Sequence, residues 1–126
     1  MKNLLTLTAA LEFPTGLVLV AFPSTLASLL LGTTLDTPGA LTIVRFAGVA
    51  LIALGSACWI VRNDSRNTAA KGLVVAMLVY NAGVTIVLVH AKLSLGLSGI
   101  GLWPVVVAHL AMATWCFLSL QQKSTS

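Results

Sequence analysis

Four long apolar runs, separated by short polar stretches, dominate the pattern of the chain. The runs cover about residues 4–22, 40–61, 69–90 and 99–120. Each is close to the roughly 20 residues that an α-helix needs to cross a hydrocarbon core about 30 Å thick. They lack the strict alternation of apolar and polar positions that a membrane-spanning strand requires. The pattern therefore predicts an all-α integral membrane protein with four transmembrane helices.

A shorter apolar segment follows the first run. Residues 24–31 begin with Ser and are followed by Gly32, which is typical of a helix start and a helix stop. The segment is too short to span a bilayer, so we expect a short helix at the membrane interface. Residues 32–39 are rich in Thr, Asp, Pro and Gly, which indicates turns. Short links between long helices favour an antiparallel four-helix bundle in a single domain, residues 1–126.

Composition supports insertion into a lipid bilayer. Hydrophobic residues make up 58% of the chain and charged residues 8%, with a mean hydropathy of +1.02. A soluble domain carries about a quarter charged residues, so these few charges could not cover a surface that faces water on all sides. The net charge of +4 is interpreted as a topology signal, and nucleic acid is not expected as a partner.

The basic residues predict an orientation. One side of the four-span topology holds Lys2, Arg62, Arg66, Lys71 and Lys123. The other side holds Lys92. The positive-inside rule then places the N- and C-termini on the cytoplasmic side of the membrane. Cleavage of the first span as a signal peptide is not expected, because its apolar run before Glu12 is short.

Polar side chains interrupt the apolar runs at a shared depth. At 1.5 Å per residue, Glu12, Tyr80, Asn81 and His109 each lie about 14 to 15 Å from the same membrane face. Arg45 lies about 8 Å below that face, and its side chain can reach deeper or snorkel outward. Polar groups are costly in lipid and point inward by default. We therefore expect these five residues to line a polar cavity that binds a small or lipid-like molecule.

Helical spacing indicates which faces turn inward. Thr8 and Glu12 share one stripe of the first span, and Gly48 and Gly55 share a stripe with Arg45 that permits close packing within or between subunits. A structural interpretation stays open, in which Glu12 pairs with Arg45 to set helix register, or is protonated and hydrogen-bonded. Cys58 and Cys116 are expected to be two free, buried thiols.

Catalytic and cofactor motifs are missing from the sequence. It contains no P-loop, GxSxG, HExxH or CxxC pattern, and no metal site is predicted. His90 and His109 lie at different depths, which does not suit the paired axial ligands of a transmembrane haem. Catalytic residues and cofactors therefore stay unassigned. An intramembrane enzyme that uses Glu12 or His109 as acid or base is kept as an alternative.

Three segments carry a resemblance to a known group. They are FPSTLASLLLG at 22–32, RFAGVALIALGSACWIVR at 45–62 and GLWPVVVAH at 101–109. With them the chain resembles the small four-helix bacterial membrane proteins of the DoxX-like group. Some members resemble membrane subunits of quinone-linked oxidoreductase systems, which implies a second alternative: a non-catalytic subunit of a larger membrane complex. The resemblance assigns no cofactor residue.

A comparison with small multidrug transporters rests on one residue. Glu12 is similar to their intramembrane glutamate in kind and rough position, whereas an intramembrane Arg45 would neutralise a carboxylate that binds cations. Transport is therefore one version of the ligand-binding hypothesis. A bundle of this size encloses little volume, so a homodimer is the default expectation.

Overall fold

The computed structural model describes residues 1–64 and 67–122. It contains five helices in this part of the chain: α1 (Lys2–Ala21), α2 (Pro23–Leu31), α3 (Pro38–Val61), α4 (Thr68–Leu95) and α5 (Leu102–Gln121). All but α2 are long and apolar enough to cross a membrane. The prediction of a helical protein with four candidate spans is confirmed. Arg66 and Lys123, two of the residues that predict the orientation, lie outside the described residues.

Local capping residues set the helix boundaries. Gly32 closes α2 in the left-handed conformation, with a φ of 69°, as its place in the sequence predicts. The side chains of Thr37 and Asn67 cap the starts of α3 and α4 by accepting backbone N–H groups at 3.3 and 2.7 Å. α4 continues to Leu95, beyond the expected boundary at residue 90, because Gly96 is the first residue there that ends a helix.

Helices α1 and α3 form a close pair. A Cβ atom added to Gly16 would lie 2.5 Å from the Gly48 carbonyl oxygen, and one added to Gly55 would lie 2.8 Å from the Phe13 nitrogen. Glycine lets two helix backbones approach to this distance. The contacts run in opposite order along the two helices, so their chain directions oppose. The glycine stripe that the sequence indicates on α3 is thus used within the chain, against α1.

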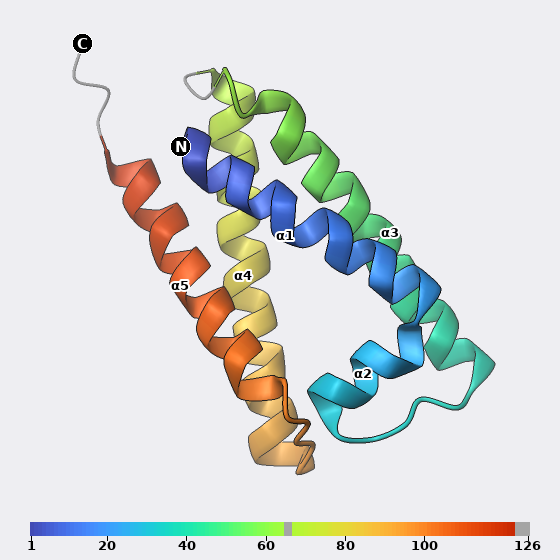
Figure 1. Ribbon diagram of the computed structural model, residues 1–126. Coiled ribbons are helices and arrows are strands. Elements are labelled where there is room, and N and C mark those ends of the chain that lie inside the picture. Colours follow the sequence, from blue (N-terminus) through green and yellow to red (C-terminus); the bar gives the residue numbers. More distant parts are fainter. Residues whose placement is uncertain (65–66, 123–126) are drawn as a thin grey trace.

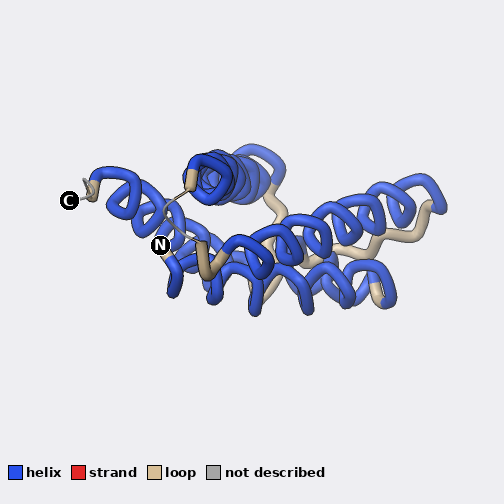
Figure 2. Tube along the Cα trace, turned by 90° about the horizontal axis from the view of Figure 1, so that it is seen from above, coloured by secondary structure: helices blue, strands red, loops and turns tan. Residues whose placement is uncertain are grey.

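Helices α4 and α5 form a second pair, and the two pairs are splayed. Figure 1 shows that they meet where α1 begins and separate toward α2, and Figure 2 shows the same divergence from above. An apolar cluster fills the end where they meet: Leu4, Leu5, Ala9, Cys58, Ala70, Val74, Met77 and Cys116. The four long helices therefore form a V-shaped bundle, which is packed at this end and open toward α2.

Helix α2 lies across the open end of the V. The backbone N–H groups of Ser98, Gly99 and Gly101 donate to the carbonyls of Leu31, Leu30 and Leu29 at 2.9, 3.0 and 2.9 Å. These carbonyls belong to the last turn of α2 and have no partner within the helix. The link between α4 and α5 therefore ties α2 to the second pair.

Gly99→Ala is expected to loosen this attachment. A Cβ atom there would lie 2.6 Å from backbone carbons of Leu29 and Leu30, and backbone atoms cannot yield as a flexible side chain does. We expect faster hydrogen exchange at the Gly101 amide and a loss of about 1–3 kcal/mol in unfolding free energy. Gly39→Ala is the control, since no neighbouring atom lies within 4 Å of its added Cβ. Equal amide exchange in both variants would contradict the expectation.

Candidate functional site

A polar centre lies where the two helix pairs begin to separate. The Tyr80 hydroxyl on α4 lies 3.5 Å from Glu12 Oε2 on α1. The rings of Tyr80 and His109 on α5 meet edge to face, with centroids 5.5 Å apart. His109 Nδ1 lies 2.7 Å from Asn81 Oδ1. Four of the five predicted site residues therefore form one continuous chain of contacts across three helices.

Two apolar clusters enclose this centre along the helix axes. The first is the cluster at the joined end of the V. The second contains Leu88, Leu102 and Val106, with Leu31 of α2 packed against it. The polar side chains are thus set between apolar layers, as the shared depth of their positions in the sequence predicts.

Hydrogen bonding assigns the protons of His109. The Asn81 Nδ2 group donates to the Met77 carbonyl at 2.7 Å, so Oδ1 of the same amide is an acceptor. The His109 Nδ1 atom, 2.7 Å away, must then carry the proton. In the neutral ring this leaves Nε2 with a lone pair, ready to accept a hydrogen bond or a proton.

Glu12 and Thr8 add unused hydrogen-bonding capacity. The Glu12 side chain is 8% exposed, and its bond to Tyr80 is at the long limit for a hydrogen bond. Thr8 lies one turn earlier and is fully buried, and its hydroxyl has no hydrogen-bond partner among the described residues. The four-residue spacing from Glu12 is the sequence signal that points to Thr8, which the predicted site residues do not include.

Thr8→Val is expected to leave the protein at least as stable. Valine keeps the shape of the side chain and removes a buried hydroxyl whose desolvation no hydrogen bond offsets. In ligand-free protein, the unfolding free energy should stay equal or rise by up to about 1 kcal/mol. Thr114→Val is the control, because the Thr114 hydroxyl donates to the Leu110 carbonyl at 2.9 Å. A marked loss of stability for Thr8→Val alone would show that its hydroxyl is paired.

Arg45 does not join the polar centre. Its side chain is exposed, and its Nε group donates to the Val20 carbonyl at 3.3 Å, near the end of α1. Carbonyls in the last turn of a helix lack partners within it, so Arg45 satisfies one of them. The prediction that Arg45 lies in the bundle interior with Glu12 is therefore wrong. Tyr80 is the hydrogen-bond partner of Glu12 in its place.

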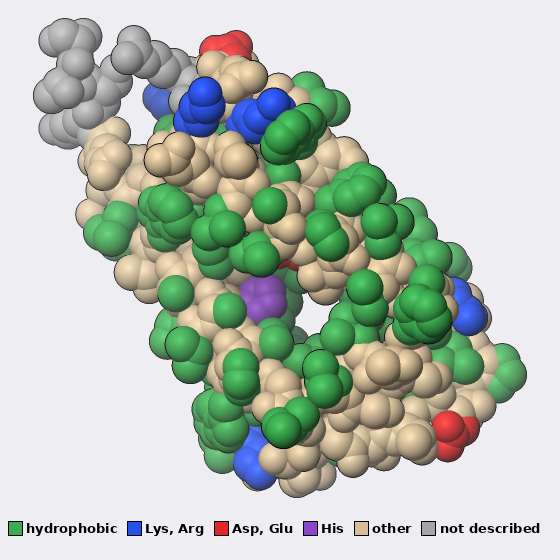
Figure 3. Space-filling model, in the orientation of Figure 1, with side chains coloured by type: hydrophobic (Ala, Val, Ile, Leu, Met, Phe, Trp, Pro, Cys, Tyr) green, Lys and Arg blue, Asp and Glu red, His purple; other side chains and the backbone are tan. Residues whose placement is uncertain are grey.

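An open space adjoins the polar centre. Figure 3 shows that the molecule is hollowed between the two helix pairs, above α2. The Glu12 carboxyl and His109 Nε2 have spare capacity to bind a donor or exchange a proton. No group of three or more His, Cys, Asp or Glu side chains within residues 1–64 and 67–122 is placed to hold a metal ion. Cys58 and Cys116 are free and fully buried, which confirms the prediction for the thiols.

Comparison of the chain with protein-family models, curated proteins and solved structures found no match. The arrangement of the polar centre is therefore the basis for a functional proposal.

Proposed function

We propose that the protein is a multi-pass membrane protein that binds a small or lipid-like molecule in the hollow between its helix pairs. The observation that carries this proposal is the chain of contacts from Glu12 through Tyr80 to His109 and Asn81. Polar side chains inside a membrane are costly, and these lie beside an open space. A bound molecule would complete their hydrogen bonding.

The polar centre favours a ligand with a hydrogen-bond donor or a positive charge. Its free groups are the Glu12 carboxyl and the acceptor nitrogen of His109. Arg45 is bonded to Val20 and does not neutralise Glu12, which removes the objection to a cationic ligand. Partly buried apolar side chains on the α2 side, among them Leu31 and Val84, suit an apolar body attached to that group. Transport of this molecule is one version of the proposal.

The proposal includes an arrangement in the membrane. The four long helices cross the bacterial inner membrane in antiparallel order, with both termini in the cytoplasm. Figure 3 shows basic side chains gathered at the end where the pairs meet, and Lys2, Arg62 and Lys71 belong to that end of α1, α3 and α4. The proposal also includes membership of the DoxX-like group. It further includes assembly of the protein as a homodimer.

Native mass spectrometry of protein released from mild detergent tests this function. Wild-type protein and the control Asp36→Asn should carry the same small bound mass, because Asp36 lies outside the four long helices. Glu12→Gln should lose that mass. Equal retention in Glu12→Gln would contradict the proposal. A wild-type species without a small molecule, but with a second polypeptide, would favour a non-catalytic membrane subunit.

A further inference from the structure

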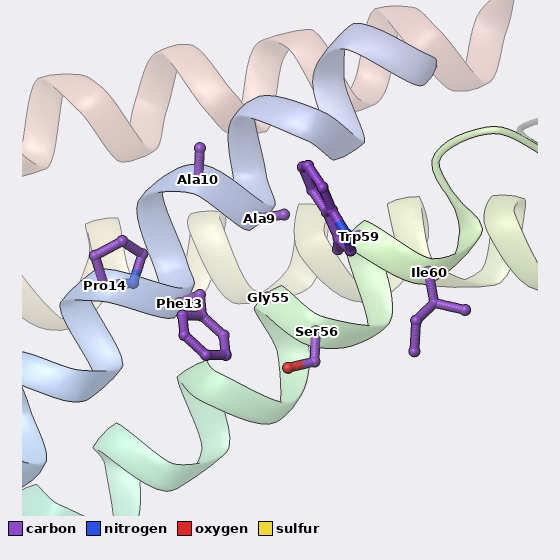
Figure 4. Close-up of a pocket in the computed structure, with 8 residues that line it drawn as sticks. All are labelled: Ala9, Ala10, Phe13, Pro14, Gly55, Ser56, Trp59 and Ile60. Carbon is purple, nitrogen blue, oxygen red and sulfur yellow. The ribbon is translucent and has the colours of Figure 1, made fainter.

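A groove between α1 and α3 lies apart from the polar centre. It has a volume of about 400 Å³, within the range of about 300–1,000 Å³ for small-molecule sites. Figure 4 shows its walls, to which α1 contributes Ala10, Phe13 and Pro14 and α3 contributes Gly55, Ser56 and Trp59. Glu12, Tyr80, Asn81 and His109 do not line it, so it is a separate site.

The groove suits a hydrocarbon chain. Ser56 is the one lining residue with a polar side-chain oxygen, and its hydroxyl donates to the Ile52 carbonyl at 2.7 Å. Phe13 and Trp59 are 39% and 51% exposed, so their rings present apolar surface to an occupant. Figure 4 shows these two side chains between the helices. An occupant would therefore be held by apolar contacts and not by hydrogen bonds.

A positioned cation stands at one end of the groove. The Arg62 guanidinium carbon lies 3.3 Å from the centroid of the Trp59 ring, and Nη1 donates to the Trp59 carbonyl. The other N–H groups of the guanidinium have no acceptor among the described residues, and they form the planar fork that matches a phosphate. Asp64, whose Oδ2 accepts from Asn67 Nδ2 at 2.6 Å, carries one negative charge at this end, and Lys2, Arg62 and Lys71 outnumber it. The charge at this end therefore complements an anion.

We infer that the groove binds an anionic phospholipid, with one acyl chain between α1 and α3 and the phosphate at Arg62. The groove extends from the middle of α1 to the end of α3, where the polar stretch 62–68 begins. A phospholipid has the same arrangement, because its apolar acyl chain leads to an anionic headgroup at the membrane interface. Lys2 and Lys71 lie at the same end of the molecule and add positive charge. This site is separate from the polar centre, and it rests on the proposed arrangement of the four long helices in a membrane.

Quenching of Trp59 fluorescence by brominated acyl chains tests the lipid site. Trp103→Phe and Trp115→Phe leave Trp59 as the only tryptophan, and the protein is placed in phosphatidylcholine vesicles with increasing brominated phosphatidylglycerol or brominated phosphatidylcholine. We expect association of phosphatidylglycerol at Trp59 to be about fivefold stronger. In this background, Arg62→Gln should lower the preference for phosphatidylglycerol over phosphatidylcholine from about fivefold to below about twofold, and Lys2 and Lys71 account for what remains. Lys92→Gln, at the opposite end of α4, should leave the preference unchanged.

A groove-filling variant separates the acyl-chain site from general attraction to the basic surface. Ala10→Leu adds apolar volume at an exposed, groove-lining position and should lower the quenching by both lipids. Equal association of the two lipids in the Trp59-only protein would overturn the inference. The inference would also be overturned if Arg62→Gln kept the full preference for phosphatidylglycerol over phosphatidylcholine. Weak quenching by both lipids together with a cross-linked dimer through this face would show that a second copy occupies the groove.

Discussion

Gly16→Ala is expected to separate α1 from α3 and to cause a large loss of stability. The added Cβ atom would lie 2.5 Å from the Gly48 carbonyl oxygen and 2.8 Å from the Ile52 nitrogen. Both are backbone atoms of a helix, so the clash is relieved only by moving the helices apart. Overpacking of this kind costs about 1–3 kcal/mol. Because α1 packs chiefly against α3, the loss should appear in unfolding of the whole protein.

The matched control for this variant is Gly83→Ala on α4. Apart from its chain neighbours and the nearby backbone of α4, no atom lies within 4 Å of the Cβ that this substitution adds, so only helix propensity changes. Alanine should then raise the unfolding free energy by up to about 1 kcal/mol. Thermal unfolding in one detergent, with helix content followed by circular dichroism, measures both variants. A Gly16→Ala protein as stable as Gly83→Ala would contradict the close α1–α3 contact.

Asn81→Leu is also expected to destabilise the protein strongly. It removes the acceptor of the His109 Nδ1–H group and leaves that donor unpaired in a half-buried position. The unfolding free energy should therefore fall by about 1–3 kcal/mol. The ring would also lose the contact that fixes which nitrogen carries the proton, so retention of the bound molecule should fall.

A double-mutant cycle with His109→Phe separates this pairing from general damage. In the absence of His109, Asn81→Leu no longer leaves a ring donor unpaired, so the two costs should not add. The expected coupling is about 0.5–1.5 kcal/mol, in the range of hydrogen bonds between membrane helices. The contrary result is that Asn81→Leu lowers the unfolding free energy equally in the wild-type protein and in His109→Phe. That result would show that the hydrogen bond does not stabilise the protein.

The positions of the helices along the chain could be predicted from the sequence. Runs of apolar residues mark α1, α3, α4 and α5, and the Gly that follows Leu31 ends α2 where it is expected. The depth of a residue along a helix is also set by a simple count. This is why Glu12, Tyr80, Asn81 and His109 meet in the structure as their positions predict.

The pairing of the helices and the direction of long side chains could not be predicted in this way. Apolar faces are interchangeable in hydropathy, so the sequence does not state that α1 packs against α3 or that the two pairs diverge. Arg45 shows the second limit. A guanidinium on a flexible stem reaches several positions from one Cα atom, and the carbonyl of Val20 holds it away from Glu12.

Reaction of Glu12 with a hydrophobic carbodiimide tests the central claim, that its carboxyl lies within reach of a molecule in the hollow. The sequence contains only two other carboxyl side chains, Asp36 and Asp64, so the modified peptide is unambiguous. We predict that Glu12 is modified in protein stripped of bound molecules and more slowly in protein that retains them. An unmodified Glu12 in stripped, folded protein would contradict the account, as would equal rates in the two preparations.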